Sequence, residues 1–309
     1  LVGYMSHIAE LPDRDFTFRY YVHDPWWLNS PWLDRYGREP HDIYLPLAVG
    51  RVDETGQTTN PTTVNILTVD DSYGAMPEQC PREVLPHLLA AVDEAPDAPG
   101  PLVWVYPFDE YHEWTFGREP RLAEVFFGDW FIRAAVNQGT PLNTVVSTRN
   151  FLATDPGRWR ERVLITPAPD ADTPLESALL EHVRRGGTVI LYGPLNHASA
   201  AVRGLLGIAL AEPLEGPLTM RVAHALDDLA EDDYCPQVEH NGLLTGGGLS
   251  EIASAGADAA VAVLATLAGP QGDRLGAVLR RDPEWDGGAL GWVRGADSYT
   301  LPPGAHLLV

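Results

Sequence analysis

The segment 173–192 constrains the fold more than any other, because it places a well-marked helix directly before a buried strand. Thr173 can accept a hydrogen bond at the helix N-terminus, and Pro174 fits the first helical position. Glu176, three residues after the threonine, completes a capping box. The helix start is therefore fixed by local chemistry.

The end of this helix is equally clear. Gly186-Gly187 stops it, and the apolar run 188–192 follows as a buried strand. An earlier apolar run, 163–166, precedes the helix. A strand, a helix and a second strand in this order predict a βαβ unit, and hence a parallel sheet with flanking helices.

Elements on both sides of this unit extend the pattern. Strands are predicted at 102–106 and 142–147, with a helix at 126–137 between them that ends at Gly139. After residue 215 the chain becomes β-rich, with short strands expected at 259–267, 275–279 and 288–293. We expect the last of these strands to add to the main sheet or to cover it.

The region before residue 100 has weaker signals. Segments 44–52 and 61–69 are strand-like, and the turn 53–57 is expected to join them as a hairpin. Segment 83–92 is helical in pattern, although Pro86 inside it predicts a kink or a late start.

Composition excludes several functions. All 21 Lys+Arg residues are Arg, and the net charge is −22. A chain without Lys has no Schiff-base or P-loop lysine, although codon bias is the simpler explanation for this absence. The acidic balance argues against nucleic acid and anionic membranes as partners. No apolar run reaches membrane-spanning length and no signal peptide is recognisable, so a cytoplasmic protein is expected.

No cofactor or metal site is predicted. Cys80 and Cys235 are far apart and have no metal-ligand spacing. The glycine-rich stretch 245–249 lacks the strand and helix that a phosphate-binding loop needs. No strand is followed by a G-x-S-x-G or G-x-C-x-G turn, so a serine or cysteine hydrolase on this sheet is disfavoured.

An aromatic segment, 23–36, is the first candidate binding site. Rings that stack on sugar faces alternate there with groups that can hydrogen-bond hydroxyls. The candidates for substrate binding are His23, Asp24, Trp26, Trp27 and Arg35. A buried plug of aromatic residues explains the same segment equally well.

Acidic residues at strand ends are the second candidate. Asp70 and Asp71, with Tyr73, follow one predicted strand, and Glu110 lies in the acidic stretch 109–113 after another. Open α/β enzymes place their chemistry at the carboxyl ends of strands. Turn capping and a solvated polar loop, respectively, are the simpler explanations. His112 has no second histidine nearby to form a metal site.

The run 102–114, the helix and strand that follow, and the unit 162–192 together resemble the glutamine-amidotransferase-like domain of bacterial family 42 beta-galactosidases. The resemblance implies a flavodoxin-like open parallel sheet of the class I glutamine-amidotransferase type, without the amidotransferase nucleophile. On this alignment 64–74 and 83–92 would be the last strand and helix of a catalytic TIM barrel. The implied division is a partial barrel-like region with the aromatic segment at 1–98, and the α/β domain with its β-rich end at 99–309.

The resemblance also implies a function. The chain would be the C-terminal portion of a glycoside hydrolase acting on neutral sugars, with its catalytic acids on earlier barrel strands and a domain that assembles trimers or dimers. Asp70, Asp71 and Tyr73 would contact sugar at the barrel mouth. Two alternatives stay open: a non-catalytic oligomerisation or sugar-binding module, and a self-contained hydrolase that uses Glu110 and His112.

Overall fold

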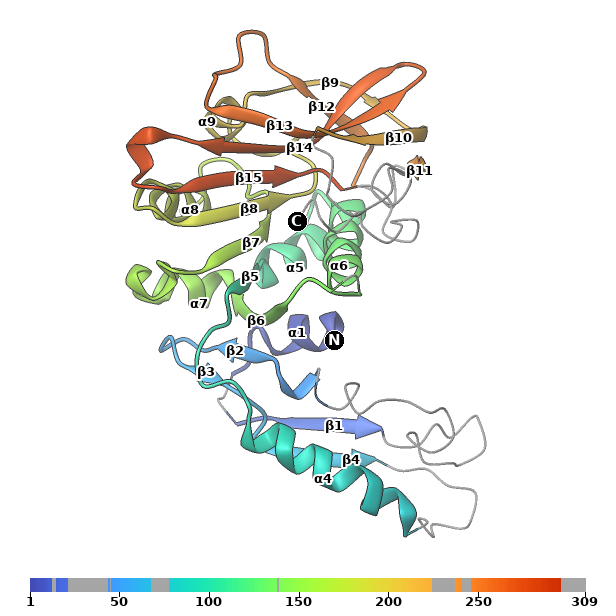
Figure 1. The fold of residues 1–309 in the computed structure, drawn as a ribbon, viewed down its shortest axis with the longest axis vertical. Helices are drawn as coiled ribbons and strands as arrows, with labels where there is room; N and C mark the ends of the chain where they lie inside the picture. Colours follow the sequence, from blue (N-terminus) through green and yellow to red (C-terminus); the bar gives the residue numbers. More distant parts are fainter. Residues whose placement is uncertain are drawn as a thin grey trace.

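The computed structural model describes residues 1–12, 15–21, 44, 46–67, 78–137, 139–223, 237–240 and 246–295 (Figure 1). The α-helices are α1 (Val2–Ile8), α4 (Gln79–Asp93), α5 (Phe108–Phe116), α6 (Leu122–Asn137), α7 (Thr148–Ala153), α8 (Pro174–Arg184) and α9 (Ala200–Leu205). The short helices η1 (Pro156–Trp159) and η2 (Pro283–Trp285) are of the 3-10 type.

The strands before residue 200 are β1 (Thr17–Tyr21), β2 (Gly50–Val52), β3 (Thr58–Thr59), β4 (Thr63–Leu67), β5 (Leu102–Tyr106), β6 (Leu142–Ser147), β7 (Val163–Pro167) and β8 (Thr188–Tyr192). Those after it are β9 (Ile208–Leu214), β10 (Gly216–Val222), β11 (Gln237–His240), β12 (Leu249–Ala253), β13 (Val261–Gly269), β14 (Gly272–Arg281) and β15 (Ala289–Val293).

A mixed α/β fold is confirmed. Its main sheet has the order β11-β10-β13-β14-β15-β8-β7-β5-β6-β2-β3. Within this order, the neighbouring strands β15, β8, β7, β5, β6 and β2 pair in parallel. The predicted βαβ unit is formed by β7 and β8, which are adjacent in the sheet, with α8 between them in sequence. The predicted strands 102–106, 142–147 and 188–192 match β5, β6 and β8 residue for residue.

The β-rich end extends this sheet instead of forming a separate body. β14, β13, β10 and β11 continue it with antiparallel pairing, and β15 joins β8 in parallel, as predicted for the last strand. β9 and β12 form a two-stranded sheet of their own. Figure 1 shows the antiparallel strands stacked above the parallel ones.

Alternating side chains of the central strands are buried in two hydrophobic cores, one on each face of the sheet. In β5, Val103 and Val105 join the core beneath α7, α8 and α9, whereas Trp104 and Tyr106 join the core beneath α1, α5 and α6. All four are buried. A strand that is apolar on both faces belongs between two helical layers, which explains why this run reads as continuously hydrophobic.

The ends of α8 follow the prediction with one difference. Thr173 Oγ1 accepts from the Glu176 N–H at 3.2 Å. The Glu176 carboxylate, however, accepts from the Asp172 N–H at 2.9 Å and from Ser199 Oγ at 2.6 Å. Because the Ser199 side chain caps α9, one carboxylate stabilises the starts of two helices.

Three predictions for the first hundred residues are wrong in part. Only residues 50–52 of the predicted strand 44–52 form a strand, because Tyr44, Pro46 and Leu47 are helical and Leu47 is buried in a small core with residues of α4. The turn 53–57 joins β2 to the short strand β3, whereas β4 pairs in parallel with β1 in a separate sheet. In place of a late start, α4 begins at Gln79 and runs through Pro86, since Leu88 and Ala91 pack against Leu47.

The predicted polar loop at 109–113 is also wrong. These residues form most of α5, whose first turn contains Asp109 and Glu110. Acidic side chains at a helix N-terminus are stabilised by the helix dipole, and this favours a helix over a loop.

Candidate functional site at the carboxyl ends of β5 and β7

The strands that follow β5 in sequence lie on both sides of it in the sheet. This reversal of strand order forms a crevice beside β5. β5 leads through α5 and α6 to β6 on one side, whereas β7 lies on the other side of β5 and leads through α8 to β8. The helices after β5 and β7 therefore cover opposite faces of the sheet. Ligands of open α/β sheets bind at such a switch point, outside the carboxyl ends of the strands.

Arg121, directly before α6, organises this crevice. Its guanidinium donates to both carboxylate oxygens of Glu124, at 2.8 Å and 2.5 Å, and to both oxygens of Asp170, at 2.7 Å and 2.9 Å. Its central carbon lies 3.8 Å from the ring centre of Trp114. Paired fork-shaped contacts and stacking on an aromatic face use the geometry that Arg has and Lys lacks. His197 Nε2 lies 3.5 Å from Glu124 on the outer side.

Among the predicted site residues that the structure describes, Glu110 lies near this crevice, within electrostatic reach of Asp170. Burial raises the pKa of its carboxyl, and the charges of Asp109 and Asp170 act in the same direction, whereas backbone and Thr148 contacts lower it. Glu110 Oε2 is buried with no hydrogen-bond partner. A carboxyl that keeps its proton to higher pH than usual can donate a hydrogen bond to an uncharged polar group.

A small hollow adjoins this cluster. Its wall combines Trp114, Phe127 and Tyr192 with Glu124 and the backbone turn at Gly193. An aromatic wall beside carboxyl groups suits a neutral polyol better than an anion. The crevice therefore suits a hydroxyl group of an uncharged ligand.

The carboxyl end of β6 carries a second cluster, which is structural. Ser147 Oγ donates to Glu10, at the end of the α1 segment, and accepts from the Asn150 N–H to cap α7. Arg149 links Glu10, at 3.3 Å, to Asp109, at 2.8 Å. Because Ser147 is only 1% exposed and its oxygen already caps α7, its hydroxyl is held inside the fold instead of being offered to a ligand.

Among the other predicted residues that the structure describes, His112 does not join the crevice. His112 and Glu113 are exposed on α5, and the His112 ring lies against Phe116 instead of Glu110. The predicted residues His23, Asp24, Trp26, Trp27, Arg35, Asp70, Asp71 and Tyr73 lie outside the described residues. Within the described ranges, no three His, Cys, Asp or Glu side chains are placed to hold a metal ion.

Sequence reasoning missed Arg121, Glu124 and Asp170. The position of Asp170, three residues after a strand, was a usable signal of the same kind that singled out Glu110. The role of Arg121 had no local signal, because it depends on which strand lies next to β5.

Comparison with known proteins gives a likeness of fold. No protein-family model matches the sequence, and a search of curated proteins finds no match. Among solved structures, a cold-adapted beta-galactosidase from Rahnella sp. R3 superposes with a TM-score of 0.54 at 13% identity, over 91% of this chain and 42% of that chain. A beta-galactosidase from Bacillus circulans sp. alkalophilus gives 0.50 at 12% identity, over 80% and 39%.

A catalytic mutant of a GH42 beta-galactosidase from G. stearothermophilus gives 0.50 at 10% identity, over 90% of this chain and 46% of that chain. The chain thus spans less than half the length of each of these enzymes. The likeness is one of fold.

No described helix has the length and apolarity that a membrane crossing requires.

Proposed function

We propose that this chain is the portion of a carbohydrate-active enzyme that follows its catalytic barrel. The portion would combine the end of that barrel, around β1, β4 and α4, with a glutamine-amidotransferase-like α/β domain that is not itself catalytic. The enzyme would be a glycoside hydrolase acting on neutral sugars. The observation that carries the proposal is the fold likeness to three beta-galactosidases, which in two of them extends over nine-tenths of the chain.

The surface of α4 supports this proposal. Leu88 and Ala91 face the small core around Leu47 and are buried. Leu85, Leu89 and Val92 continue the same apolar sector of the helix, yet they are 40%, 63% and 44% exposed. When the apolar surface of a helix is wider than the surface that is buried, another structural element is expected to pack against the exposed part. The neighbouring helix and strand of a complete barrel would cover these three side chains.

The chemistry of the sheet agrees with a supporting role. Arg121 holds Glu124 and Asp170 in ion pairs, and the Ser147 hydroxyl is engaged at a helix start. Among the described carboxylates of the crevice, Glu110 offers a buried oxygen without a hydrogen-bond partner. The crevice can therefore bind a neutral ligand. The sugar contacts predicted at 23–35 and 70–73 stay predictions.

Hydrolysis of nitrophenyl glycosides tests the proposal. The longest natural polypeptide that contains this chain should hydrolyse at least one β-glycoside, and the 309-residue chain alone should hydrolyse none. Glu110→Gln in the longer polypeptide should leave kcat within about twofold, since loss of a catalytic acid or base costs about 100-fold or more. Activity of the 309-residue chain that disappears in Glu110→Gln would establish the self-contained hydrolase instead. A longer polypeptide inactive on every glycoside would refute the glycoside hydrolase.

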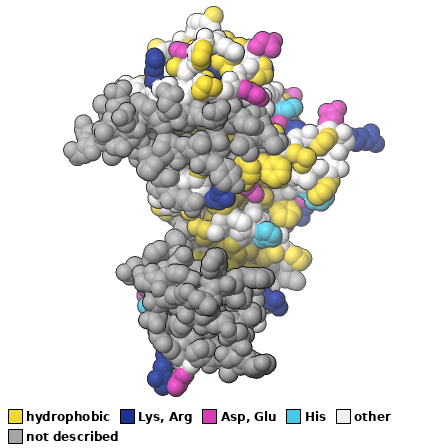
Figure 2. Space-filling model, turned by 90° about the vertical axis from the view of Figure 1, so that its right-hand side faces the viewer, with side chains coloured by type: hydrophobic (Ala, Val, Ile, Leu, Met, Phe, Trp, Pro, Cys, Tyr) yellow, Lys and Arg dark blue, Asp and Glu magenta, His cyan; other side chains and the backbone are white. Residues whose placement is uncertain are grey.

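An exposed apolar patch on α5 and α6 favours self-association as a second function. Phe116, Leu122 and Phe126 are 75%, 44% and 47% exposed. Figure 2, which views the molecule from the right-hand side of Figure 1, shows hydrophobic side chains exposed across the middle of that face. Clustered exposed aromatic residues are typical of protein interfaces. We propose that this patch joins copies of the chain into a dimer or trimer.

Sedimentation velocity tests this second function. The chain should show a concentration-dependent oligomer, and the double change Phe116→Ser and Phe126→Ser should give a monomer. Leu210→Ser is the matched control, because Leu210 is an exposed leucine on β9, away from the patch. A monomer at every concentration, or equal effects of patch and control changes, would rule the interface out.

A further inference from the structure

A second cavity lies at the opposite end of the strands from the crevice. It has a volume of about 480 Å³ and is enclosed by α7, η1, the C-terminal half of α8 and the turn before β15. η1, α8 and this turn directly precede β7, β8 and β15, so the cavity faces the amino ends of these strands. Its volume lies within the range of small-molecule sites.

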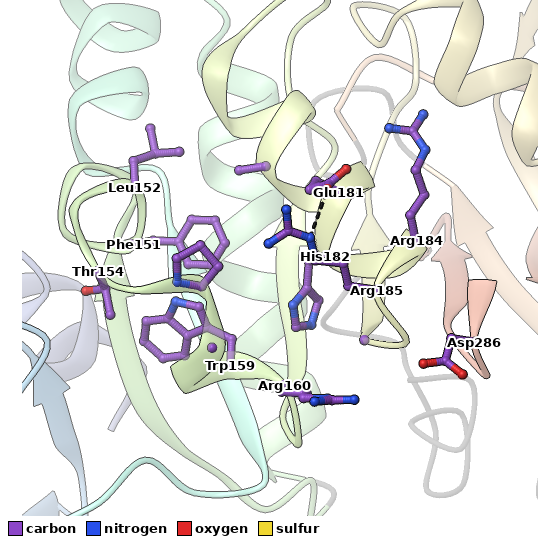
Figure 3. Close-up of a pocket in the computed structure, with 14 residues that line it drawn as sticks. Phe151, Leu152, Thr154, Trp159, Arg160, Glu181, His182, Arg184, Arg185 and Asp286 are labelled. Atoms are coloured by element: carbon purple, nitrogen blue, oxygen red, sulfur yellow. Dashed lines mark hydrogen bonds and ion pairs between the residues drawn. The ribbon is translucent and has the colours of Figure 1, made fainter.

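Aromatic rings form one wall of the cavity. Phe151 and Trp159 are buried, and their ring centres lie 5.7 Å apart at an interplanar angle of 39°. Figure 3 shows both rings on one side of the cavity, with His182 opposite them. Leu152 and Ala178 add aliphatic surface to the lining. The lining therefore fits a flat apolar body that can pack against ring faces and edges.

The end of α8 gives the opposite wall its shape. Gly186 has φ 90°, its N–H donates to Val183 O at 3.0 Å, and the Gly187 N–H donates to His182 O at 2.9 Å. These two bonds are those of a Schellman motif. A Cβ on Gly187 would lie 2.1 Å from His182 Nε2, so only glycine lets the ring lie flat against this turn.

Charge on the rim indicates what polar group the ligand carries. The rim has three arginines, Arg160, Arg184 and Arg185, against Glu181 and Asp286, in a chain whose net charge is −22. Arg185 is paired with Glu181 at 2.6 Å. Arg160 makes no ion pair with any described residue, and Figure 3 shows it extending beneath the His182 ring while Arg184 points away. One available guanidinium at an apolar cavity matches one carboxylate, which Arg binds in a two-pronged fashion.

A more highly charged ligand fits less well. A phosphate dianion would meet the carboxylates of Glu181 and Asp286 with a single cation to balance its charge. Burial lowers the pKa of His182, with a backbone hydrogen bond to Arg162 acting in the opposite direction, so this wall adds no positive charge at neutral pH.

We infer that this cavity is a binding site for a flat aromatic monocarboxylate, whose ring lies against Phe151 and Trp159 and whose carboxylate is held by Arg160. The site is independent of the proposed function, because it shares no residue with the crevice or with the apolar patch on α5 and α6.

Isothermal titration calorimetry with 2-naphthoate tests this site. The 309-residue chain should bind it saturably, with a Kd at or below about 1 mM, as expected for a ligand of this size. Arg160→Gln should weaken binding by about tenfold or more, the effect of a lost charge-assisted contact. Arg158→Gln is the matched control: it removes the same charge two positions away, inside η1, whereas Arg160 directly follows η1, and Arg158 does not line the cavity. It should change Kd by less than about twofold.

Two further measurements separate recognition from general attraction. The neutral 2-naphthamide should bind the unaltered chain about as weakly as 2-naphthoate binds Arg160→Gln. Ala178→Phe, which fills the cavity, should abolish binding while the circular dichroism spectrum stays unchanged. The inference is overturned if 2-naphthoate does not saturate, if Arg158→Gln and Arg160→Gln weaken it equally, if the amide binds as tightly as the acid, or if folded Ala178→Phe still binds.

Discussion

Glu251 is a buried carboxylate and Asp129 a partly buried one, and of the two only Glu251 is paired with an arginine. Arg294 Nε donates to Glu251 Oε2 at 3.0 Å, and both side chains are completely buried. Glu251 also accepts from the Leu195 and Ser250 N–H groups, both at 3.0 Å. Asp129, on α6, has one oxygen that is buried without a partner. The difference teaches that a carboxylate in this fold can be held in a buried ion pair or left partly buried without one.

The crevice lies between these two extremes. Arg121 and Glu124 are about one-seventh exposed and Asp170 about one-third exposed, so this ion-pair cluster is shielded but still reaches water. We therefore expect removal of a charge to cost most at Glu251, less at Arg121, and least at an exposed pair.

The largest effect is expected at Glu251. Glu251→Ala leaves the Arg294 guanidinium buried without its carboxylate, and breaking a buried pair in this way costs about 3–5 kcal/mol. The pair joins β12 to the end of β15, so the loss should lower the whole unfolding transition. Urea unfolding followed by tryptophan fluorescence measures it. If the free energy of unfolding falls by less than about 1 kcal/mol, the pair is not the structural charge described here.

The second expected effect depends on pH and concerns Asp129. Burial raises the pKa of its carboxyl to about 6, with the charge of His7 acting in the opposite direction. Because the folded state then holds the proton more tightly than the unfolded state, this carboxyl costs stability as pH rises from about 4 to about 6. At about 1.4 kcal/mol for each pH unit between 3.8 and about 6, the loss relative to an unshifted carboxyl is about 3 kcal/mol at neutral pH.

Asp129→Asn checks this sign, because the amide has the size of the acid but no charge. The variant should resemble the unaltered protein in stability near pH 4 and be the more stable of the two at pH 7. The comparison is made by urea unfolding at both pH values. Equal stability differences at pH 4 and pH 7 would show that Asp129 does not titrate in this range.

Local signals account for what the sequence predicted of the fold. The capping residues Thr173 and Glu176 and the pair Gly186-Gly187 act within one helix, and the apolar runs of β5, β6 and β8 are bounded by turn residues. Such signals give the elements and the fold class. They do not give the order of strands, which depends on how helices pack on the two faces of the sheet.

The candidate site shows the consequence of this limit. The place of Glu110 after a strand is a local signal, but Asp170 follows β7, which lies next to β5 only because the chain crosses to the side of β5 away from β6. Arg121 reaches Asp170 across 49 positions of the sequence. In the same way, the local pattern predicts a hairpin between 44–52 and 61–69. It contains no signal that β4 pairs with β1, which lies 46 residues earlier in the sequence.

A moderate effect is expected at Arg121. Arg121→Gln removes charge-assisted contacts to Glu124 and Asp170 and the stacking on Trp114, but both carboxylates can then be solvated in part. Hydrogen bonds to charged groups are worth about 1.5–3 kcal/mol when shielded, and partial exposure reduces this to about 1–2 kcal/mol. Urea unfolding at pH 7 measures the change. A cost as large as that of Glu251→Ala would mean that the crevice is as closed to water as the Arg294 pair.

The smallest effect is expected at the exposed pair on α8. Glu181 and Arg185 lie 2.6 Å apart, and their side chains are 47% and 66% exposed. Glu181→Gln should change the free energy of unfolding by no more than about 0.5 kcal/mol, because exposed pairs one helical turn apart contribute little. The free energy of unfolding at low and high salt, measured for both Glu181→Gln and Glu251→Ala, distinguishes an ion pair exposed to water from a buried one. Salt should diminish the small Glu181 effect and leave the Glu251 effect nearly unchanged, since ions screen pairs in water and not pairs enclosed by protein.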